Sequence, residues 1–153
     1  MASNSVKEDT IRAVLGKVFR RYVQTHCYHW NVEGPNFHSL HAMFETQYQT
    51  LNGFMDTVAE RLRVLDVKAP ASLDELLVSC TGTQLSAAKT ADEMLANHCT
   101  DFLNFIDALR NAIQVLADVR DDGTVGVMTD ILEWSEKERW RMSAAAKQMV
   151  ILN

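Results

Sequence analysis

The sequence predicts an all-α fold: a bundle of four long helices, with one short extra helix between the second and the third. Four long stretches carry apolar residues in alternating steps of three and four, which is the periodicity of a helix with one buried face. Only 2 prolines and 6 glycines interrupt the 153 residues, which is too few for a loop-rich or all-β chain. We expect a single domain over residues 1–153.

The first two helices are expected over residues 6–32 and 36–65. Gly34-Pro35 ends the first helix, because glycine and proline together disfavour its continuation. Asn36 then stands where it can cap the second helix. The apolar seam of the second helix has one polar member, Gln47.

The third helix is expected over residues 84–120 and the fourth over 124–150, with Thr124 as its cap. A short apolar piece inside the preceding connection predicts an extra helix at about 72–80. Such a connection carries the chain from one end of the bundle to the other, so the arrangement is ferritin-like rather than a simple up-and-down bundle. The sequence indicates no partner for His98.

Composition and charge exclude several classes of protein. The net charge is −5, so the chain as a whole has no electrostatic footprint for nucleic acid. No run of about 18 apolar residues predicts a membrane span, and the N-terminal segment lacks the features of a secretory signal. Cys27, Cys80 and Cys99 form no C-x-x-C pair and are expected to be reduced thiols with no function that the sequence indicates. We therefore expect a cytoplasmic protein.

Four residues of metal-binding type share one stripe of the second helix, apart from its apolar seam: His41, Glu45, Asp56 and Glu60. The first two are spaced four residues apart, as are the last two, so each pair is close enough to share an ion. The two pairs lie about 22 Å apart along the helix axis, so one ion cannot touch both. An antiparallel second copy of the helix, related by a two-fold axis, would bring the first pair of one subunit beside the second pair of the other.

His29, just before the Gly-Pro turn, is the natural fifth ligand. Two imidazoles and three carboxylates suit Fe(II) or another borderline divalent ion. His26 and His38 are expected to be neighbours of the site rather than ligands. The same residue types are also common on solvated helix faces, so the spacing alone leaves both interpretations open.

The run HWNVEGPNFHSLHAMFE, followed by MDTVAERL, resembles the signature of the Dps-type miniferritins, the DNA-binding proteins from starved cells. The likeness continues through DDGTVGVMTDILEWSEKERW and covers most of the chain. It implies a homo-oligomeric hollow shell, a dodecamer, with ferroxidase activity and no organic cofactor. Such a shell oxidises Fe(II), typically with hydrogen peroxide, and stores the Fe(III) mineral as protection against oxidative stress. The ligands that it implies, from both subunits of a two-fold dimer, are His29, His41, Glu45, Asp56 and Glu60.

The resemblance also bears on residues around the implied site. Glu45 stands where the family commonly has aspartate, which leaves open whether one or two irons bind at each site. In the family, a tryptophan beside the site is thought to capture stray oxidising equivalents; Trp30 has this position, and an interface aromatic is the alternative. The family's iron-entry pores at three-fold axes are acidic, and the candidates here are Asp121, Asp122 and Asp130. Acidic residues near a helix N-terminus are also favourable without any pore.

Two other functions compete with iron oxidation. Some members of the family bind and compact DNA through a flexible lysine-rich tail, whereas MASNSVKEDT has one lysine against two acids. With a negative net charge, we expect DNA binding to be weak or absent at physiological salt. The other alternative is a non-catalytic shell that buffers metal ions.

Overall fold

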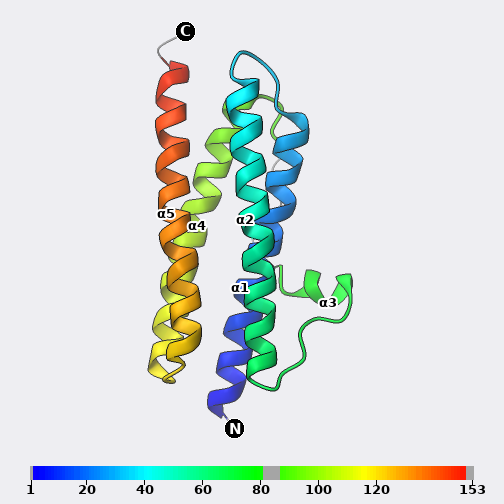
Figure 1. Ribbon diagram of the computed structural model, residues 1–153, viewed down its shortest axis with the longest axis vertical. Coiled ribbons are helices and arrows are strands. Elements are labelled where there is room, and N and C mark those ends of the chain that lie inside the picture. Colours follow the sequence, from blue (N-terminus) through cyan, green and yellow to red (C-terminus); the bar gives the residue numbers. More distant parts are fainter. Residues whose placement is uncertain (1, 81–86, 151–153) are drawn as a thin grey trace.

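The computed structural model describes residues 2–80 and 87–150, and these form five helices and no strand (Figure 1). The helices are α1 (Ala2–Asn31), α2 (Phe37–Val64), α3 (Leu73–Val78), α4 (Ala91–Asp118) and α5 (Asp122–Val150). The predicted all-α bundle with a short crossover helix is confirmed. No helix of the described residues is long and apolar enough to cross a membrane.

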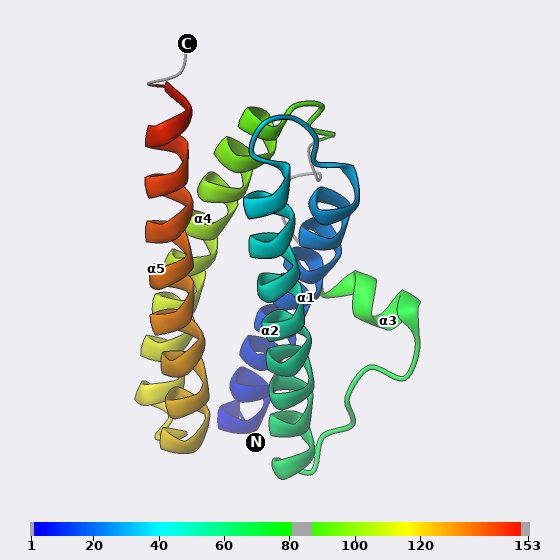
Figure 2. The same cartoon turned by 45° about the horizontal axis from the view of Figure 1, so that its top comes forward.

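The four long helices form two hairpins, α1–α2 and α4–α5, which lie side by side (Figures 1 and 2). The two hairpin turns lie at opposite ends of the bundle (Figure 1). The crossover therefore leads from the end of α2 at one end of the bundle to the start of α4 at the other. Along this route α3 projects from the side of the bundle and packs against α1.

The start of α4 differs from the expectation. The helix begins at Ala91 instead of residue 84; residues 87–90 are not helical, and residues 81–86 lie outside the described residues. Thr90 and Glu93 explain the start, because they form a capping box. The Thr90 hydroxyl accepts from the Glu93 backbone N–H at 3.2 Å, and the Glu93 carboxylate accepts from the Thr90 N–H at 3.1 Å.

The start of α5 also differs from the prediction, because Asp121 caps this helix and Thr124 does not. The Asp121 carboxylate accepts hydrogen bonds from the backbone N–H of Thr124 at 3.2 Å and from its hydroxyl at 2.7 Å. Arg61 of α2 donates to the same carboxylate at 3.4 Å. The helix α2 begins directly after Asn36 as expected, although the Asn36 side chain makes no capping hydrogen bond.

The crossover is attached to α1 at a glycine. A Cβ atom on Gly16 would lie 2.0 Å from the carbonyl oxygen of Ser79, so only glycine leaves room for the end of α3 here. The thiol of Cys80 donates to the Gly16 carbonyl oxygen at 3.3 Å. At its other end, α3 is capped by Ser72, whose hydroxyl accepts from the backbone N–H of Glu75 at 3.2 Å.

The core contains two apolar clusters. One is built around Leu15, Leu51 and Leu109, and the other around Phe44 and Phe102. All six of the fully buried positions of α2 lie on its predicted seam, and Gln47 is among them. Along α1, α2 and α5, buried polar residues stand between the members of the two clusters.

These polar residues form a network that joins all four long helices. His98 of α4 donates from Nε2 to Gln47 Oε1 at 3.0 Å, and Gln47 of α2 donates to the Glu138 carboxylate of α5 at 3.0 Å. Arg141 donates to the other oxygen of Glu138 at 2.5 Å. The hydroxyl of Thr25 on α1 lies 3.4 Å from the same His98 nitrogen. Because the pairing provides hydrogen-bond partners for Gln47, for Glu138 and for Nε2 of His98, the polar interruption of the α2 seam is part of the core.

Burial is the main reason why the pKa of His98 falls to about 3, and the positive charge of Arg21 adds to it. The ring is therefore neutral near pH 7. Since its Nε2 faces an amide oxygen, this nitrogen carries the proton, and Nδ1 is left as an acceptor without a hydrogen-bond partner.

Candidate functional site

His29 and His41 face each other across the α1–α2 turn. The Nδ1 atom of His29 lies 2.9 Å from the carbonyl oxygen of His41, and Nδ1 of His41 lies 2.9 Å from the carbonyl oxygen of His29. The two rings are stacked, with centroids 3.7 Å apart and planes inclined by 22°. A carbonyl oxygen accepts a hydrogen bond, so each Nδ1 carries a proton. In the neutral imidazole this leaves the lone pair on Nε2, the atom that a metal ion would bind.

The turn explains why the two residues meet. Gly34 has a φ of 101°, a conformation that glycine adopts without strain, and it reverses the chain between the helices. His29 stands in the last turn of α1, where backbone carbonyl groups lack a partner within the helix. The ring of His41 supplies that partner. The ring of Phe37 lies against the His41 ring with centroids 4.8 Å apart.

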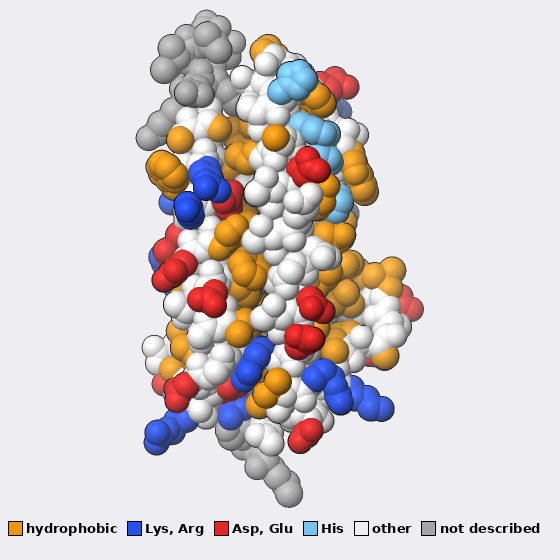
Figure 3. Space-filling model, in the orientation of Figure 1, with side chains coloured by type: hydrophobic (Ala, Val, Ile, Leu, Met, Phe, Trp, Pro, Cys, Tyr) orange, Lys and Arg blue, Asp and Glu red, His pale blue; other side chains and the backbone are white. Residues whose placement is uncertain are grey.

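The three carboxylates of the predicted site lie on α2, and all three side chains are exposed. Glu45 lies one turn beyond His41 on α2. Its carboxylate accepts a hydrogen bond from the Gln49 amide in a long contact of 3.5 Å. Figure 3 shows histidine side chains gathered near the upper end of one face, with acidic side chains further down it.

No group of three or more His, Cys, Asp or Glu side chains in the described part of the chain lies close enough together to hold a metal ion. One subunit thus brings together His29 and His41 and leaves Asp56 and Glu60 apart from them. A site shared between subunits requires the two histidines to lie apart from the two carboxylates within one subunit. The contribution of the partner subunit to the site remains a prediction.

The aromatic surroundings of the histidine pair include Tyr48, on α2. The Tyr48 ring is edge-on to the His29 ring, with centroids 5.2 Å apart, and it stacks on the His26 ring at 3.7 Å. The His26 ring in turn lies 5.2 Å from that of Trp30, whose side chain is 67% exposed. His26 is therefore a neighbour of the histidine pair through Tyr48. His38 is exposed and contacts the Phe37 ring.

Comparison with known proteins places the chain in a family. Residues 8–150 match the model of the ferritin-like domain. The DNA protection during starvation protein of Brevibacillus brevis is 32% identical over 123 residues, which cover 80% of this chain and 83% of that protein. The crystal structure of a Dps protein from Bacillus brevis superposes with a TM-score of 0.88 at 28% identity, over 94% of this chain and 97% of that one. The chain belongs to the ferritin-like family and is a Dps-type miniferritin.

A further relative supports the same assignment. Antigen TpF1 of Treponema pallidum is 34% identical to this miniferritin over 128 residues, covering 82% of this chain and 72% of that protein. Its crystal structure has a TM-score of 0.88 at 29% identity, over 96% and 95% of the two chains. The ferritin-like fold is thereby confirmed. Membership of the family supports iron storage and protection, with a ferroxidase-type activity, as the general function.

The three candidate pore residues of the miniferritin have different surroundings. Asp121 is only 7% exposed, and its carboxylate is occupied by Thr124 and Arg61. Its observed role is to start α5 and to connect that helix to α2. Asp122 and Asp130 are exposed, so they are the two candidates with side chains available to solvent.

Tyr48 is not among the site residues predicted from the sequence. The residue follows His41 by seven positions, or about two helical turns, which places both on the same side of α2. This spacing is the sequence feature that places Tyr48 near the histidine pair. It is a weak indication, because an isolated tyrosine on a helix more often packs against the core than contacts a ligand-binding residue.

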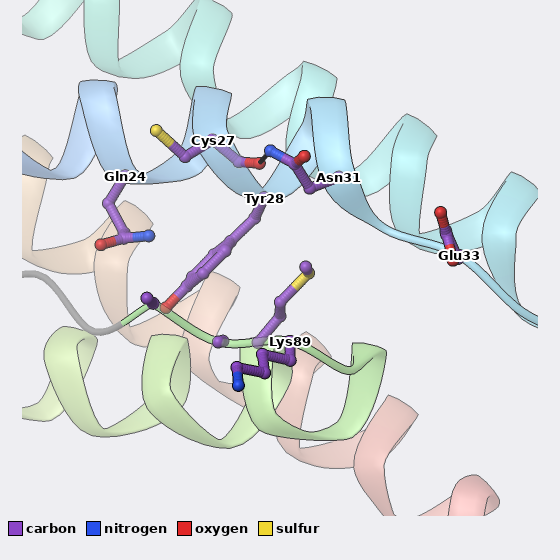
Figure 4. A pocket seen from close by; sticks show the side chains of 9 residues that line it. Gln24, Cys27, Tyr28, Asn31, Glu33 and Lys89 are labelled. Atoms are coloured by element: carbon purple, nitrogen blue, oxygen red, sulfur yellow. Dashed lines mark hydrogen bonds between the residues drawn. The ribbon is translucent and has the colours of Figure 1, made fainter.

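A pocket of about 570 Å³ lies away from the histidine pair, between the last turns of α1 and the segment that precedes α4 (Figure 4). Its lining includes Gln24, Cys27, Tyr28, Asn31, Glu33 and Lys89. The Gln24 side chain is 4% exposed, and its Oε1 has no hydrogen-bond partner. None of the predicted iron ligands of this miniferritin lines the pocket, so we assign it no part in iron chemistry.

Proposed function

We propose that this miniferritin assembles into a dodecamer of cytoplasmic subunits that oxidises Fe(II) at sites shared across two-fold interfaces and stores the ferric mineral inside. The observation that carries the proposal is the reciprocal pairing of His29 and His41. Each ring is held at Nδ1 by the other residue's backbone, which leaves Nε2 of both rings outside these hydrogen bonds and available to bind metal. The three free cysteines support a reducing, cytoplasmic compartment.

The remaining ligands come from α2. Glu45 lies one turn beyond His41, and Asp56 and Glu60 of the partner subunit complete the site in this proposal. Fe(II) is the substrate, and anionic oxygen ligands favour its ferric product. Hydrogen peroxide is the preferred oxidant: two Fe(II) ions each lose one electron, the O–O bond breaks and two hydroxide ions form. Iron approaches through acidic pores to which the exposed Asp122 and Asp130 contribute.

A complementation experiment tests the shared site. One variant carries His29→Ala and His41→Ala, the other carries Asp56→Ala and Glu60→Ala, and each alone is expected to oxidise Fe(II) only at the background rate. Co-assembly of the two produces dimers in which one of the two sites has all its ligands. Random mixing is then expected to restore about a quarter of the wild-type rate, because half of the dimers are mixed.

The control is a mixture of each variant with itself, treated in the same way, with the oligomeric state followed by light scattering. Recovery of no activity in fully mixed assemblies would show that the two halves do not meet across an interface. Running the assay with peroxide and with oxygen identifies the preferred oxidant. Tight Fe(II) binding without oxidation by either would identify a metal-buffering shell.

Weak DNA binding is also part of the proposal. The name of the Brevibacillus brevis relative refers to DNA protection, whereas this chain carries a net charge of −5. Phosphate contacts need lysine and arginine in excess, so electrostatic repulsion opposes binding. A gel-shift titration at about 0.15 M salt is expected to show no complex, and a robust shift would contradict this part.

A further inference from the structure

A buried amide oxygen without a hydrogen-bond partner lines the pocket between the end of α1 and the segment before α4. Gln24 of α1 is 4% exposed, and its Oε1 makes no hydrogen bond. Its side chain extends from α1 towards that segment (Figure 4). A buried oxygen without a donor costs folding free energy, whereas leucine, which has a similar size, would fill the position without that cost. A ligand that donates a hydrogen bond to Gln24 would offset the cost.

The pocket has the size and the length of a small-molecule site. Its volume of about 570 Å³ lies within the range of about 300–1,000 Å³ that is common for such sites. It extends along α1 from Gln24 to Asn31 and on to Glu33 (Figure 4). Residues 24 to 31 of a helix rise about 10 Å, so a ligand that reaches both ends must be elongated. An extended chain of about three amino-acid residues has this length.

The polar groups of the pocket define the chemistry of the ligand. The Asn31 amide donates from Nδ2 to the Cys27 carbonyl oxygen at 2.7 Å, which leaves its Oδ1 as a second acceptor beside α1. Both amide oxygens therefore need donors from a ligand. Among the described lining residues, Glu33 is the one carboxylate and Lys89 the one ammonium group, and both side chains are exposed. Their formal charges cancel, so the lining favours a ligand with one positive and one negative group.

The segment that carries Lys89 is attached to the start of α4. The backbone N–H of Lys89 donates to the Glu93 carboxylate at 2.8 Å, the same carboxylate that takes part in the capping box. Lys89 thereby lies across the pocket from α1 (Figure 4). Between the two walls, Met94, which is 2% exposed, and Ala88 supply apolar surface for small side chains.

We propose that this pocket binds a short zwitterionic peptide of about three residues. The ammonium group of the peptide pairs with Glu33, a peptide N–H donates to Oε1 of Gln24, and the carboxylate pairs with Lys89. A single amino acid is too short to make these contacts together. A nucleotide would bring an excess of negative charge to a lining that is neutral overall. The binding site is separate from the predicted iron ligands, so this inference does not depend on the proposed ferroxidase function.

The test titrates the full-length assembled protein, without iron, with tri-alanine in a calorimeter. Wild type is expected to bind tri-alanine saturably, and Gln24→Leu to bind it at least about tenfold more weakly, because the hydrogen bond to Oε1 is lost. Without peptide, Gln24→Leu should melt at a higher temperature than wild type, which separates loss of the contact from loss of the fold. Gln114→Leu is the matched control, because Gln114 is an exposed glutamine of α4 outside the pocket. It is expected to bind as wild type.

Two derivatives of the peptide test the charged contacts without any change in the protein. N-acetyl-tri-alanine lacks the ammonium group and tri-alanine amide lacks the carboxylate, so wild type is expected to bind both more weakly than tri-alanine. Glu33→Gln should no longer distinguish tri-alanine from the acetylated peptide, and Lys89→Gln should no longer distinguish it from the amide.

The place of binding is read from the cysteines. Cys27 lines the pocket, whereas Cys80 and Cys99, which are free and half-buried as well, do not. Saturating tri-alanine is expected to slow the alkylation of Cys27 by iodoacetamide, followed by peptide mass spectrometry. The rates at Cys80 and Cys99 should not change.

Several outcomes would overturn the inference. They are no saturable binding of tri-alanine, equal affinities of wild type and Gln24→Leu, equal affinities of wild type for the three peptides, and binding that leaves the alkylation of Cys27 unchanged. Binding of adenosine monophosphate in preference to tri-alanine would assign the pocket to nucleotides and would also contradict the proposal. None of these outcomes bears on iron oxidation, which is measured separately.

Discussion

The imidazole rings of His29 and His41 are each held by a hydrogen bond to the other residue's backbone carbonyl group. The pair thereby connects the last turn of α1 to the first turns of α2. Neither ring can rotate away without losing its own hydrogen bond and its stacking on the other. The orientation of both candidate ligands therefore depends on the turn at Gly34 that brings the two helices together.

Replacement of either histidine is expected to weaken Fe(II) binding beyond the loss of one ligand. In His41→Ala, His29 loses the ring that it stacks on and the hydrogen bond to its carbonyl, so both ligands are disturbed. We expect each single variant to lose at least about 10–100-fold in affinity, and the double variant to lose less than the product of the two. Anaerobic calorimetry measures these values. The control is His38→Ala, which removes an exposed histidine outside the pair and is expected to bind as wild type.

Removal of Gln47 is expected to destabilise the bundle. Gln47→Leu leaves the buried Nε2–H of His98 and one oxygen of Glu138 without their hydrogen bonds. Since unpaired buried polar groups are costly, the free energy of unfolding should fall by about 2–5 kcal/mol. Urea unfolding at fixed protein concentration measures the change. Gln49→Ala, at an exposed position two residues further along α2, should change it by less than about 0.5 kcal/mol, and an equal effect of the two would contradict the importance of the network.

Acid is expected to destabilise the fold through His98. Its pKa is about 3 in the folded chain and near 6.5 when exposed, so between these values only the unfolded chain binds the extra proton. The free energy of unfolding therefore falls as pH drops below about 6.5, by about 2 kcal/mol between about pH 7 and about pH 5. His98→Gln should lack this contribution. Unfolding curves of both proteins at the two pH values measure the difference, and identical pH dependence would disprove the assignment.

A methyl group at position 16 is expected to displace the end of α3. Gly16→Ala puts a Cβ 2.0 Å from the Ser79 carbonyl oxygen, which is backbone and cannot simply rotate aside. Such overpacking should lower the free energy of unfolding by about 1–3 kcal/mol and expose the crossover to limited proteolysis. Gly126→Ala is the matched control, because nothing lies within 4 Å of its added Cβ. It should be neutral or stabilise α5 by up to about 1 kcal/mol.

Helical periodicity was sufficient to predict the bundle and the buried seam of α2, because a 3.6-residue repeat identifies the face that turns inward. It could not show which residues meet across helices. Gln47 and His98 are far apart in sequence, and their pairing depends on the axial position of α2 relative to α4. The predicted start of α4 at residue 84 is wrong, because the stretch before Thr90 contains residues that favour a helix. The T-x-x-E sequence of Thr90 and Glu93 is the feature that indicates the observed start.

The candidate site was also predictable in part. The Gly-Pro turn indicated that His29 and His41 would stand near each other, since the two helices that it joins must run side by side. The exchange of hydrogen bonds between them depends on the path of the backbone through that turn, which residue spacing does not describe. The positions of Asp56 and Glu60 relative to the histidines of another subunit remain a prediction, because they depend on an interface.

The network of Thr25, Gln47, His98 and Glu138 also has a consequence for the axial positions of the helices. Smooth apolar seams allow two helices to slide past each other by a turn, because one leucine packs much like the next. A buried row of donors and acceptors permits only one axial position of the helices, since a shift of one turn, about 5.4 Å, would break its hydrogen bonds. The network thereby fixes the axial register of the four long helices. It sets how far the carboxylates of α2 stand from the end of the bundle, a distance that two subunits must match to share an ion.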